Sequence, residues 1–308
     1  METVLITGGT GMIGKALTQA LIERGFNVII LTRNASKQKP TPSISFAEWD
    51  IEKQTIDKKA FAKADYIIHL AGASVAEKRW NDKRKQEIVR SRVDSGKLLV
   101  ESLKTIPNKV KTVICASGIG WYGPDKNDGK EFKEEDLSSN DFLGQTCKQW
   151  EAAIEQTSFL GKRLVKIRIG IVLSNEGGAY PEFKKPLKFA LATILGNGKQ
   201  IVSWIHIDDL VRMILFAMEN EKMEGVYNAV APHPVSNKKL VLEIARKERG
   251  KSYIPVPVPI FALKIRLGEM SIEVLKSATV SSEKIQQAGF IFQYPEIESA
   301  ILQLAHKK

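Results

Sequence analysis

The stretch VLITGGTGMIGKAL, residues 4–17, decides the fold. It joins an apolar run, which predicts a buried strand, to a segment that favours a helix. Gly8, Gly11 and Gly14 lie between the two in the pattern G-x-x-G-x-x-G. In such a turn the first glycine allows a tight bend, the second lets the backbone approach a pyrophosphate, and the third lets helix and strand pack closely. Because the helix N-terminus would also present unpaired N–H groups to the phosphates, the stretch predicts a dinucleotide site, with a purely structural turn as the alternative.

Strand and helix signals alternate along the chain as far as about residue 175. Apolar strands are predicted at residues 1–7, 26–33, 64–72, 110–118 and 162–174. Helices are predicted at residues 14–24, 87–104 and 144–157. Strands that are apolar throughout and alternate with helices indicate a parallel sheet covered on both faces. We therefore expect an α/β fold with a Rossmann-like, doubly wound parallel sheet.

The pattern changes after about residue 175. Residues 177–200 carry helix and turn signals of their own, and residues 202–220 return to a strand followed by a helix. Proline at alternate positions within 253–270 excludes a central strand and predicts an extended segment that leads into a helix. We expect a dinucleotide-binding domain at 1–175, to which 201–230 return, and a small C-terminal cap domain on the substrate side, formed by 176–200 and 231–308.

The composition is that of a globular protein, with 43% apolar and 26% charged residues. A net charge of +11 would suit nucleic acid, but Lys and Arg alternate with acids, so we expect a solvated basic surface that favours an anionic cofactor or substrate. No window approaches the roughly 20 apolar residues of a membrane span, and the first residues lack the basic segment of a secretory signal. Cys115 and Cys147 stand alone, which predicts neither a disulfide nor a metal site. We expect a cytoplasmic protein without a nucleic-acid or membrane partner.

The end of the second predicted strand indicates which dinucleotide binds. NAD sites usually carry Asp or Glu at this point, which accepts a hydrogen bond from the 2′-hydroxyl of the adenosine ribose. The sequence here is LTRN, with Arg33 and no acid. A guanidinium suits a 2′-phosphate through paired, charge-assisted hydrogen bonds. We therefore expect NADP(H), with an ordinary surface arginine as the alternative.

Several segments resemble one known family. The glycine turn, HLAGA (69–73) and SGIGWYG (117–123) resemble the extended short-chain dehydrogenase/reductases, the sugar-nucleotide epimerase/dehydratase group. Similarity to the YfcH-like NAD-dependent epimerase/dehydratases is carried by RWNDKRKQEIVRSR (79–92), QWEAAI (149–154), SWIHIDDLVRMI (203–214) and GVYNAVAPHPVSN (225–237). A C-terminal domain of the DUF1731 type is resembled by PVPIFALKIRLGEM (257–270) and KIQQAGFIFQYP (284–295). The resemblance spans nearly the whole chain.

This resemblance implies a cofactor site along the carboxyl edge of the sheet. It assigns the pyrophosphate to the glycine turn and the adenosine end to residues after the second and third strands. The remaining contacts fall on the segments after the next strands and on one helix. The implied cofactor residues are Gly8, Thr10, Gly11, Met12, Ile13, Gly14, Thr32, Arg33, Asp50, Ile51, Leu70, Ala71, Gly72, Glu87, Arg92 and Val172.

The catalytic residues of the extended enzymes do not carry over. Those enzymes use a Ser or Thr with a Tyr and a Lys in the pattern Y-x-x-x-K, in which the lysine lowers the pKa of the tyrosine that exchanges a proton. Alignment on the helix at 144–157 places Leu143 at the tyrosine and Cys147 at the lysine. Lys148 comes one residue late, about 100° around the helix, and Gly118 takes the place of the serine. The ordinary proton transfer is therefore absent.

Other side chains could serve such a site. Ser117 and Tyr122 are the candidate catalytic residues, and Trp204 and His206 are candidates for substrate contact, although each could be a structural residue instead. One hypothesis is an NADP(H)-dependent oxidoreductase or nucleoside-diphosphate-sugar epimerase-like enzyme that acts on a small molecule with an unusual proton donor. The other is a non-catalytic NADP(H)-binding sensor or regulatory protein. The missing Tyr-Lys pair favours the second and the retained cap favours the first; we favour the enzyme.

Overall fold

The centre of the structure is an eight-stranded sheet with the strand order β13-β7-β6-β5-β1-β2-β3-β4. The computed structural model describes residues 1–126 and 128–306. Every pairing in this sheet is parallel except that of β4 with β3. The strands are β1 (Thr3–Thr7), β2 (Asn27–Thr32), β3 (Ile44–Asp50), β4 (Thr55–Ile56), β5 (Tyr66–His69), β6 (Thr112–Gly118), β7 (Arg163–Ile169) and β13 (Gly225–Ala229). The predicted Rossmann-like parallel sheet is confirmed.

Alternate residues of each strand face opposite layers, because successive side chains of a strand point to opposite sides of a sheet. In β1, Val4 and Ile6 belong to one buried apolar cluster and Leu5 to another. A strand that is buried on both sides has to be apolar at nearly every position. This is why the sequence shows continuous apolar runs here instead of a polar–apolar alternation.

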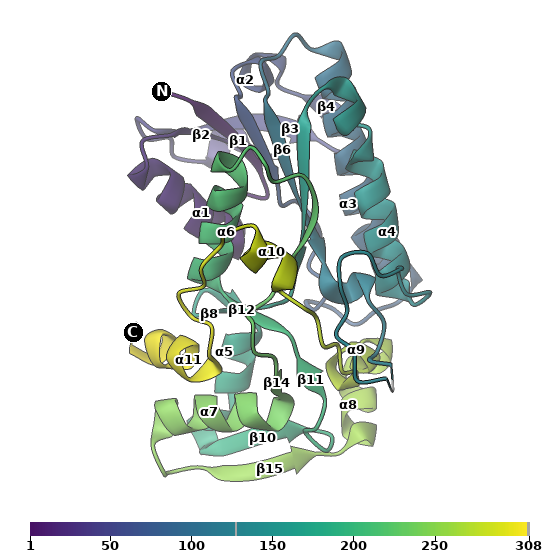
Figure 1. Cartoon of the computed structure of the whole chain (residues 1–308), viewed down its shortest axis with the longest axis vertical. Coiled ribbons are helices and arrows are strands. Elements are labelled where there is room, and N and C mark those ends of the chain that lie inside the picture. The colour runs from purple at the N-terminus through teal and green to yellow at the C-terminus, as the bar shows by residue number, and fades with distance from the viewer. Residues whose placement is uncertain (127, 307–308) are drawn as a thin grey trace.

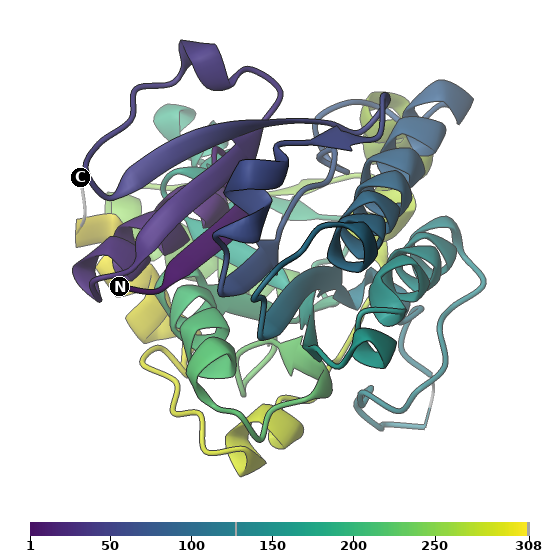
Figure 2. The same ribbon diagram turned by 90° about the horizontal axis from the view of Figure 1, so that it is seen from above.

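Helices cover both faces of this sheet (Figure 1, Figure 2). On one face lie α1 (Met12–Glu23) and α6 (Ile207–Glu219), whose Leu17 and Leu210 belong to the same cluster as Val4. On the other face lie α2 (Lys58–Ala62), α3 (Asp82–Thr105) and α4 (Phe142–Glu155). The three helices predicted before residue 160 thus correspond to α1, α3 and α4.

The direction of winding reverses beside β1. The chain passes from β1 to β2 and β3 on one side, and from β5 through β6 and β7 to β13 on the other. In open parallel sheets, ligands bind outside the carboxyl ends of the strands at such a reversal point. The carboxyl ends of β1, β2, β3 and β5 are the places to which the sequence assigns most of the cofactor contacts.

The strand predicted at 162–174 is divided in two by the fold. β7 stays in the large sheet beside β13, whereas β8 (Ile171–Ser174) leaves it and pairs with β12 (Trp204–His206). Gly170 lies at the division, where its N–H donates to the Ala229 carbonyl and an added Cβ would lie 2.7 Å from the Ser203 carbonyl oxygen. The prediction of one continuous strand was therefore wrong. Both pieces are apolar, so the sequence pattern does not reveal the division at Gly170.

The remaining elements gather at the lower end of the molecule in Figure 1. Besides β8 and β12 they include β9 (Gly177–Gly178), β10 (Leu191–Leu195), β11 (Ile201–Val202), β14 (Val235–Ser236), β15 (Ile254–Val258), α5 (Ala179–Lys184), α7 (Asn237–Arg249), α8 (Ile260–Leu267), α9 (Ser271–Leu275) and α11 (Ile297–His306). Along the whole described chain, the 3-10 helices are η1 (Ala35–Lys37), η2 (Ile119–Trp121), η3 (Ser158–Leu160), η4 (Pro186–Phe189) and η5 (Gly268–Met270). A separate apolar cluster, which includes Tyr180, Trp204, Leu240 and Ile301, forms the core of this part.

The alternating prolines fall on the outer edge of a two-stranded sheet. β15 pairs in parallel with β10, and Ile254 donates its N–H to the Ala190 carbonyl. Pro255 and Pro257 alternate with the residues whose backbone hydrogen-bonds toward β10, such as Ile254 and Val258. The outer edge therefore lacks N–H groups at the proline positions. An edge of this kind resists the addition of another strand. The expected extended segment is present, and it leads into α8.

One part of the C-terminal region returns to the large sheet. α10 (Glu283–Gln287) and the residues that follow it contribute Ile285 and Phe290 to the apolar cluster under β1 and α6. The Lys284 ammonium donates to the Val226 carbonyl of β13. Residues 283–290 thus lie against the large sheet, although the sequence assigned them to the small domain, because their apolar side chains complete the face that α6 leaves open.

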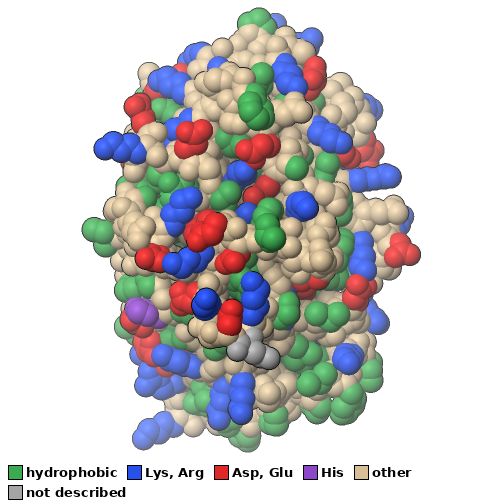
Figure 3. All heavy atoms as spheres, turned by 45° about the vertical axis from the view of Figure 1, so that its right-hand side comes forward, with side chains coloured by type: hydrophobic (Ala, Val, Ile, Leu, Met, Phe, Trp, Pro, Cys, Tyr) green, Lys and Arg blue, Asp and Glu red, His purple; other side chains and the backbone are tan. Residues whose placement is uncertain are grey.

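The surface carries both signs of charge side by side. In Figure 3 the Lys and Arg side chains are interspersed with Asp and Glu over the face shown. Within the described ranges, none of the helices combines the length and the apolar character that crossing a bilayer requires.

Candidate dinucleotide and catalytic site

The three glycines of the turn have different reasons to be glycine. Gly8 has a φ of +73°, and a Cβ there would lie 2.8 Å from the Leu70 carbonyl carbon. A Cβ on Gly14 would lie 2.4 Å from the Gly8 carbonyl oxygen, so this position needs glycine for the packing of α1 against the turn. At Gly11 an added Cβ meets only the Gly8 oxygen, at 3.3 Å, and the residue is exposed. Gly11 is thus the glycine of the three at which an added Cβ would meet the least of the protein itself.

The N-terminus of α1 is open to a ligand. Among the described helices of twelve or more residues, α3, α4, α6 and α7 have a side chain that accepts a hydrogen bond from the first turn, and α1 has none. The first turn of α1 also carries no acidic residue. Thr10 is exposed, and Met12 and Ile13 are partly buried. Unpaired N–H groups next to an exposed glycine fit a pyrophosphate, because the helix end carries a partial positive charge.

The end of β2 presents a free cation. Arg33 is exposed, and its side chain has no hydrogen bond or ion pair with any described residue. The preceding Thr32 is partly buried and accepts the Asn34 N–H at 3.4 Å. After β3, Asp50 accepts the N–H groups of Glu52 and Lys53 at 2.9 and 3.1 Å, and these hydrogen bonds hold the pKa of Asp50 below its usual value.

Ile51, next to Asp50, packs against the apolar cluster of the α3 side. The structure thus brings these predicted adenosine-side residues to the carboxyl ends of β2 and β3, which are neighbouring strands.

A buried histidine positions the segment after β5. His69 Nδ1 lies 2.7 Å from Thr7 Oγ1, which accepts the Ala71 N–H at 3.2 Å, and His69 Nε2 lies 3.2 Å from Ser95 Oγ. Ser95 in turn donates to the Ser91 carbonyl. Burial lowers the pKa of His69 to about 3, so the ring stays neutral. Leu70, Ala71 and Gly72 are therefore held in place between β1 and α3, with Gly72 exposed.

Two arginines of α3 contact residues 73 and 74, which follow Gly72. The nearly buried Arg84 donates to the Glu87 carboxylate at 2.7 Å and to the carbonyl of Ser74, and it lowers the pKa of Glu87. Glu87, predicted to face the cofactor, is thus tied to Arg84, with 57% of its side chain exposed. Arg92 is mostly buried beside Gly72.

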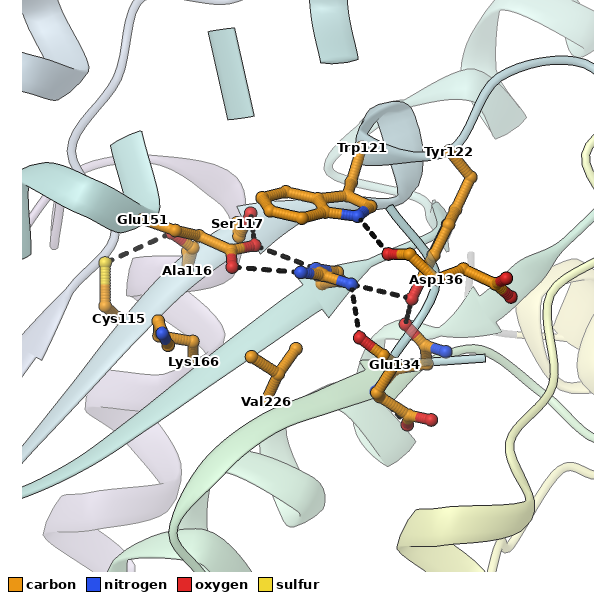
Figure 4. A network of polar contacts seen from close by, with 12 residues as sticks. Cys115, Ala116, Ser117, Trp121, Tyr122, Glu134, Asp136, Glu151, Lys166 and Val226 are labelled. Atoms are coloured by element: carbon orange, nitrogen blue, oxygen red, sulfur yellow. Dashed lines mark hydrogen bonds and ion pairs between the residues drawn. The ribbon is translucent and has the colours of Figure 1, made fainter. Parts of the chain in front are cut away.

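A buried polar network lies under the carboxyl ends of β6 and β7 (Figure 4). Arg168 of β7 donates from Nε to Glu151 Oε1 at 2.8 Å and from Nη2 to Oε2 at 3.1 Å. Ser117 Oγ donates to the same Glu151 Oε1 at 2.7 Å. The guanidinium also lies against the ring of Trp121, with Cζ 3.7 Å from the ring centroid. Ser117, Glu151 and Arg168 are all at most 5% exposed.

Tyr122 belongs to the same network. Its side chain has no exposed surface, and its hydroxyl donates to Asn228 Oδ1 at 2.8 Å while it accepts from Arg168 Nη1 at 3.0 Å. Burial raises the pKa of Tyr122 to about 12. Asn228 is held on its other side by Glu134 and Ser281. In this conformation the hydroxyl has no open path to a substrate.

α4 carries Leu143 and Cys147, the residues that the sequence comparison puts at the positions of the tyrosine and the lysine. Leu143 packs against Gly120, where an added Cβ would lie 3.1 Å from the Leu143 Cβ. Cys147 is buried, and burial together with the charge of Glu151 raises the pKa of its thiol to about 11. Lys148 is exposed, on another face of α4. No residue of this helix therefore places a phenol or an ammonium beside Ser117.

Trp204 and His206 have other partners. Trp204 donates its indole N–H to the His233 carbonyl at 3.1 Å. His206 Nδ1 accepts the Asp208 N–H at 3.1 Å and so caps α6, while its Nε2 lies 3.0 Å from Gln303 Oε1. Both side chains have no exposed surface. Neither side chain is therefore open to a substrate in this structure, and the substrate role that the sequence predicts for them stays a prediction.

Val172 lies near the glycine turn. It belongs to β8, which pairs with β12 and β9. A Cβ on Gly178 of β9 would lie 3.0 Å from the Val172 carbonyl oxygen and 3.6 Å from Met12 Sδ. The strand that leaves the large sheet at Gly170 thus returns to the side of α1.

Glu151, Arg168 and Asn228 were not among the predicted site residues. The available signal for Arg168 was an arginine between two isoleucines at the end of a buried strand. For Glu151 it was a glutamate between the buried Trp150 and Ile154 of α4. Asn228 gave no comparable signal. In the described part of the chain, no group of three His, Cys, Asp or Glu side chains is placed to hold a metal ion.

Comparison with known proteins gives this architecture a family. Residues 4–152 and 183–229 match the NAD dependent epimerase/dehydratase family. The chain belongs to this family. Residues 258–304 match a domain of unknown function, DUF1731. The resemblance stated from the sequence is thereby confirmed.

Two curated relatives have the same length as this chain or nearly so. The epimerase family protein SSP1921 of Staphylococcus saprophyticus is 38% identical over 99% of this chain and 100% of its own. The epimerase family protein YfhF of Bacillus subtilis is 35% identical over 98% of this chain and 97% of its own.

Two solved structures share the fold over 99% of this chain. The human epimerase family protein SDR39U1, solved with NADPH, is 28% identical with a TM-score of 0.86, over 99% of this chain and 100% of that chain. A nucleoside-diphosphate sugar epimerase from Corynebacterium glutamicum is 32% identical with a TM-score of 0.77, over 99% of this chain and 58% of that chain.

Proposed function

We propose that this protein is an NADP(H)-dependent oxidoreductase of the sugar-nucleotide epimerase-like type, acting on a small molecule. The observation that carries the proposal is the end of β2, where Arg33 is exposed, pairs with no residue that the structure describes, and is not accompanied by an acid. The open N-terminus of α1 and the bare Gly11 supply a place for the pyrophosphate between Arg33 and the β5 side of the sheet. The NADPH in the human relative supports the same choice of cofactor.

The chain's own residues would bind and orient the cofactor. The first-turn N–H groups of α1 would hold the pyrophosphate, and Arg33 with Thr32 the adenosine 2′-phosphate. Leu70, Ala71 and Gly72, fixed by His69, would support the middle of the molecule. When bound, the nicotinamide supplies or accepts a hydride.

The proposal predicts a preference for NADPH over NADH. We expect Arg33→Ala to weaken NADPH binding by about 1.5–3 kcal/mol, the scale of hydrogen bonds to a charged group, and to leave NADH binding unchanged. Titration by tryptophan fluorescence or calorimetry measures both affinities. Lys37→Ala is the matched control, since it removes an exposed cation from the segment that follows. Equal affinities for the two cofactors in the unmodified protein would remove the role given to Arg33.

Proton transfer is the part of the mechanism that the geometry constrains most. Ser117 donates to Glu151, and the Tyr122 hydroxyl is enclosed by Asn228 and Arg168. A water molecule near the carboxyl ends of β6 and β7 would therefore be a more accessible proton source than Tyr122 in this conformation. The proton donor of the proposed reaction is either such a water or the Ser117 hydroxyl, which would first have to break its hydrogen bond to Glu151.

We expect Tyr122→Phe to act on stability more than on chemistry. The change strands Asn228 Oδ1 and one donor of Arg168 in a buried place, which should lower the free energy of unfolding by about 1–3 kcal/mol. NADPH affinity should stay the same. If Tyr122 were the proton donor, the substitution would instead lower turnover about 10²–10⁴-fold with little change in stability. Urea denaturation, NADPH titration and, with a substrate in hand, initial rates separate the two roles.

A second candidate function is a non-catalytic NADP(H)-binding sensor or regulator. Leu143 and Cys147 in place of the Tyr-Lys pair favour it, together with the engaged hydroxyls of Ser117 and Tyr122. A screen of carbonyl, enone and sugar-nucleotide compounds against folded protein distinguishes the two functions. NADPH binding without NADPH oxidation by any of them would support the sensor.

A further inference from the structure

The short helix α8 carries apolar side chains on its outward side. Leu263 is its buried residue, with 5% of its surface exposed. Ile265 comes two positions later, which places it about 200° around the helix from Leu263, and it is 70% exposed. Phe261 lies one turn before Ile265 and is 67% exposed. The side of α8 opposite its buried residue is therefore apolar, whereas the outward side of a surface helix is normally polar.

Two cations flank this apolar side. Lys264 and Arg266 come directly before and after Ile265, so they lie about 100° from it in opposite directions around the helix. Both residues are exposed, and neither side chain has a hydrogen bond or ion pair with a described residue. Long cationic side chains can follow an apolar surface with their methylene groups and keep the charge at its polar border. α8 thus presents apolar side chains between two cations.

The strand before α8 extends this surface. Ile254 begins β15 and is 62% exposed, and its N–H donates to the Ala190 carbonyl at 2.8 Å. Phe189, next to Ala190, is 79% exposed. β15 leads directly into α8, and both lie at the lower end of the molecule (Figure 1). The α8–β15 surface, as we call it, is defined by Phe189, Ile254, Phe261, Lys264, Ile265 and Arg266.

The chain around the α8–β15 surface is basic and free of acids. Residues 183–207, which include β10, and residues 249–268, which include β15 and α8, contain four Lys or Arg each and no Asp or Glu. Lys188 and Lys251, near the starts of β10 and β15, are exposed and form no ion pair with a described residue. The surface therefore suits a partner that takes up apolar side chains and is negatively charged around them.

Two other kinds of partner fit less well. A second copy of the chain would bring unpaired cations against one another, which like-charge repulsion opposes. A partner that adds a strand to β15 would meet Pro255 and Pro257, which offer no N–H along the outer edge. A bilayer with anionic headgroups meets both demands, because apolar side chains enter it below the headgroups and Lys and Arg stay beside the negative charges.

We propose that the α8–β15 surface binds the protein peripherally to a membrane surface with anionic lipid headgroups, with Phe261 and Ile265 inserted and Lys264 and Arg266 at the headgroups. The proposal is independent of the proposed NADP(H) function. It departs from the expectation that the chain has no membrane partner, which rested on the lack of a spanning segment and of a secretory signal. Peripheral binding needs neither of them.

Vesicle sedimentation tests the apolar part of the surface. The probes are vesicles of phosphatidylcholine alone and vesicles of phosphatidylcholine and phosphatidylglycerol in equal amounts. The variant is Phe261→Ser with Ile265→Ser, and the matched control is Phe159→Ser with Ile291→Ser, a Phe and an Ile that are 83% and 77% exposed elsewhere. We expect the affinity for the mixed vesicles to fall about 10- to 100-fold in the variant and to stay unchanged in the control.

A second pair of variants tests the charges. Lys264→Gln with Arg266→Gln removes the two flanking cations, and Lys58→Gln with Lys59→Gln removes two exposed cations from α2 at the other end of the molecule (Figure 1). The net charge changes equally in both. We expect the first variant to bind the mixed vesicles about 10-fold more weakly than the second. High salt should weaken the binding of the unmodified protein, since exposed charges are screened.

Each of the other outcomes overturns the proposal. These are failure of the unmodified protein to bind the mixed vesicles, equal binding to both kinds of vesicle, and equal affinities of a variant and its control. A dimer in gel filtration that Phe261→Ser with Ile265→Ser abolishes also overturns it, because a second copy would then cover the surface. Thermal unfolding checks that each variant is folded. If the serine pair is not, Phe261→Ala with Ile265→Ala replaces it, and binding equal to that of the control overturns the proposal.

Discussion

Replacement of Glu151 by alanine should lower the free energy of unfolding by about 3–5 kcal/mol, the usual cost of removing one partner from a buried ion pair. The Glu151 carboxylate accepts two hydrogen bonds from Arg168 and one from Ser117, all within 3.1 Å. The side chains of Arg168 and Glu151 are 2% and 6% exposed. Without the carboxylate, Arg168 would keep its charge in a place that water does not reach. Urea denaturation followed by circular dichroism measures the change.

A neighbouring pair on the same helix gives the control. Glu155 lies one turn after Glu151 and pairs with Lys166, but 47% of its side chain is exposed. Glu155→Ala should therefore cost less than Glu151→Ala, because Glu155 itself lies half in solvent, although Lys166, whose side chain is 10% exposed, loses its partner. The double variant Glu151→Leu with Arg168→Met removes both charges and should recover much of the loss. Equal stabilities of Glu151→Ala and Glu155→Ala would show that the buried pair contributes little.

This network ties segments together that lie far apart in the sequence. Arg168 joins β7 to α4 through Glu151 and to Tyr122 after β6, and it also donates to the Glu134 carbonyl. Asn228 of β13 extends the network by donating from Nδ2 to the carbonyl of Ser281, just before α10. The network therefore fixes the residues after β6, which form one side of the proposed site. Its integrity should affect the shape of the site even though no member needs to touch a ligand.

The geometry of the glycine turn could be predicted because its determinants are local. Gly8, Gly11 and Gly14 are close in sequence, and their spacing alone fixes which one turns, which one packs and which one is bare. Arg33 follows directly from the next strand of the same unit. The parallel sheet was likewise predictable, since strands buried on both faces are apolar throughout.

The rest of the site depended on contacts between distant residues. Tyr122 and Arg168 are 46 residues apart, and Tyr122 and Asn228 are 106 apart. Sequence patterns do not reveal such pairings. The sequence therefore allowed Tyr122 as a candidate proton donor, whereas the structure encloses its hydroxyl between Asn228 and Arg168. The burial of Trp204 and His206 was hidden for the same reason, since their partners His233 and Gln303 lie in the C-terminal third.

Alanine at Gly14 and alanine at Gly11 should differ in their effect on stability, although both should weaken NADPH binding. A methyl group at Gly14 would lie 2.4 Å from the Gly8 carbonyl oxygen and 2.5 Å from the Gly9 Cα, and both are backbone atoms. The helix and the turn would have to move apart, which should lower the free energy of unfolding by about 3 kcal/mol, at the upper end of the range for overpacked positions. NADPH binding should fall as well, because the first turn of α1 moves with the helix.

Gly11→Ala leaves the protein itself almost undisturbed. Gly11 has a φ of −79°, which alanine adopts freely, and its added Cβ would meet only one protein atom, at 3.3 Å. We expect stability to change by less than about 1 kcal/mol, the scale on which alanine and glycine differ at the start of a helix. The methyl group would nevertheless project where a pyrophosphate has to approach, so NADPH binding should weaken by about 1–3 kcal/mol. Urea denaturation and NADPH titration of both variants measure the two effects. A Gly11→Ala variant that is stable and binds NADPH normally would show that the turn serves the fold and not a dinucleotide.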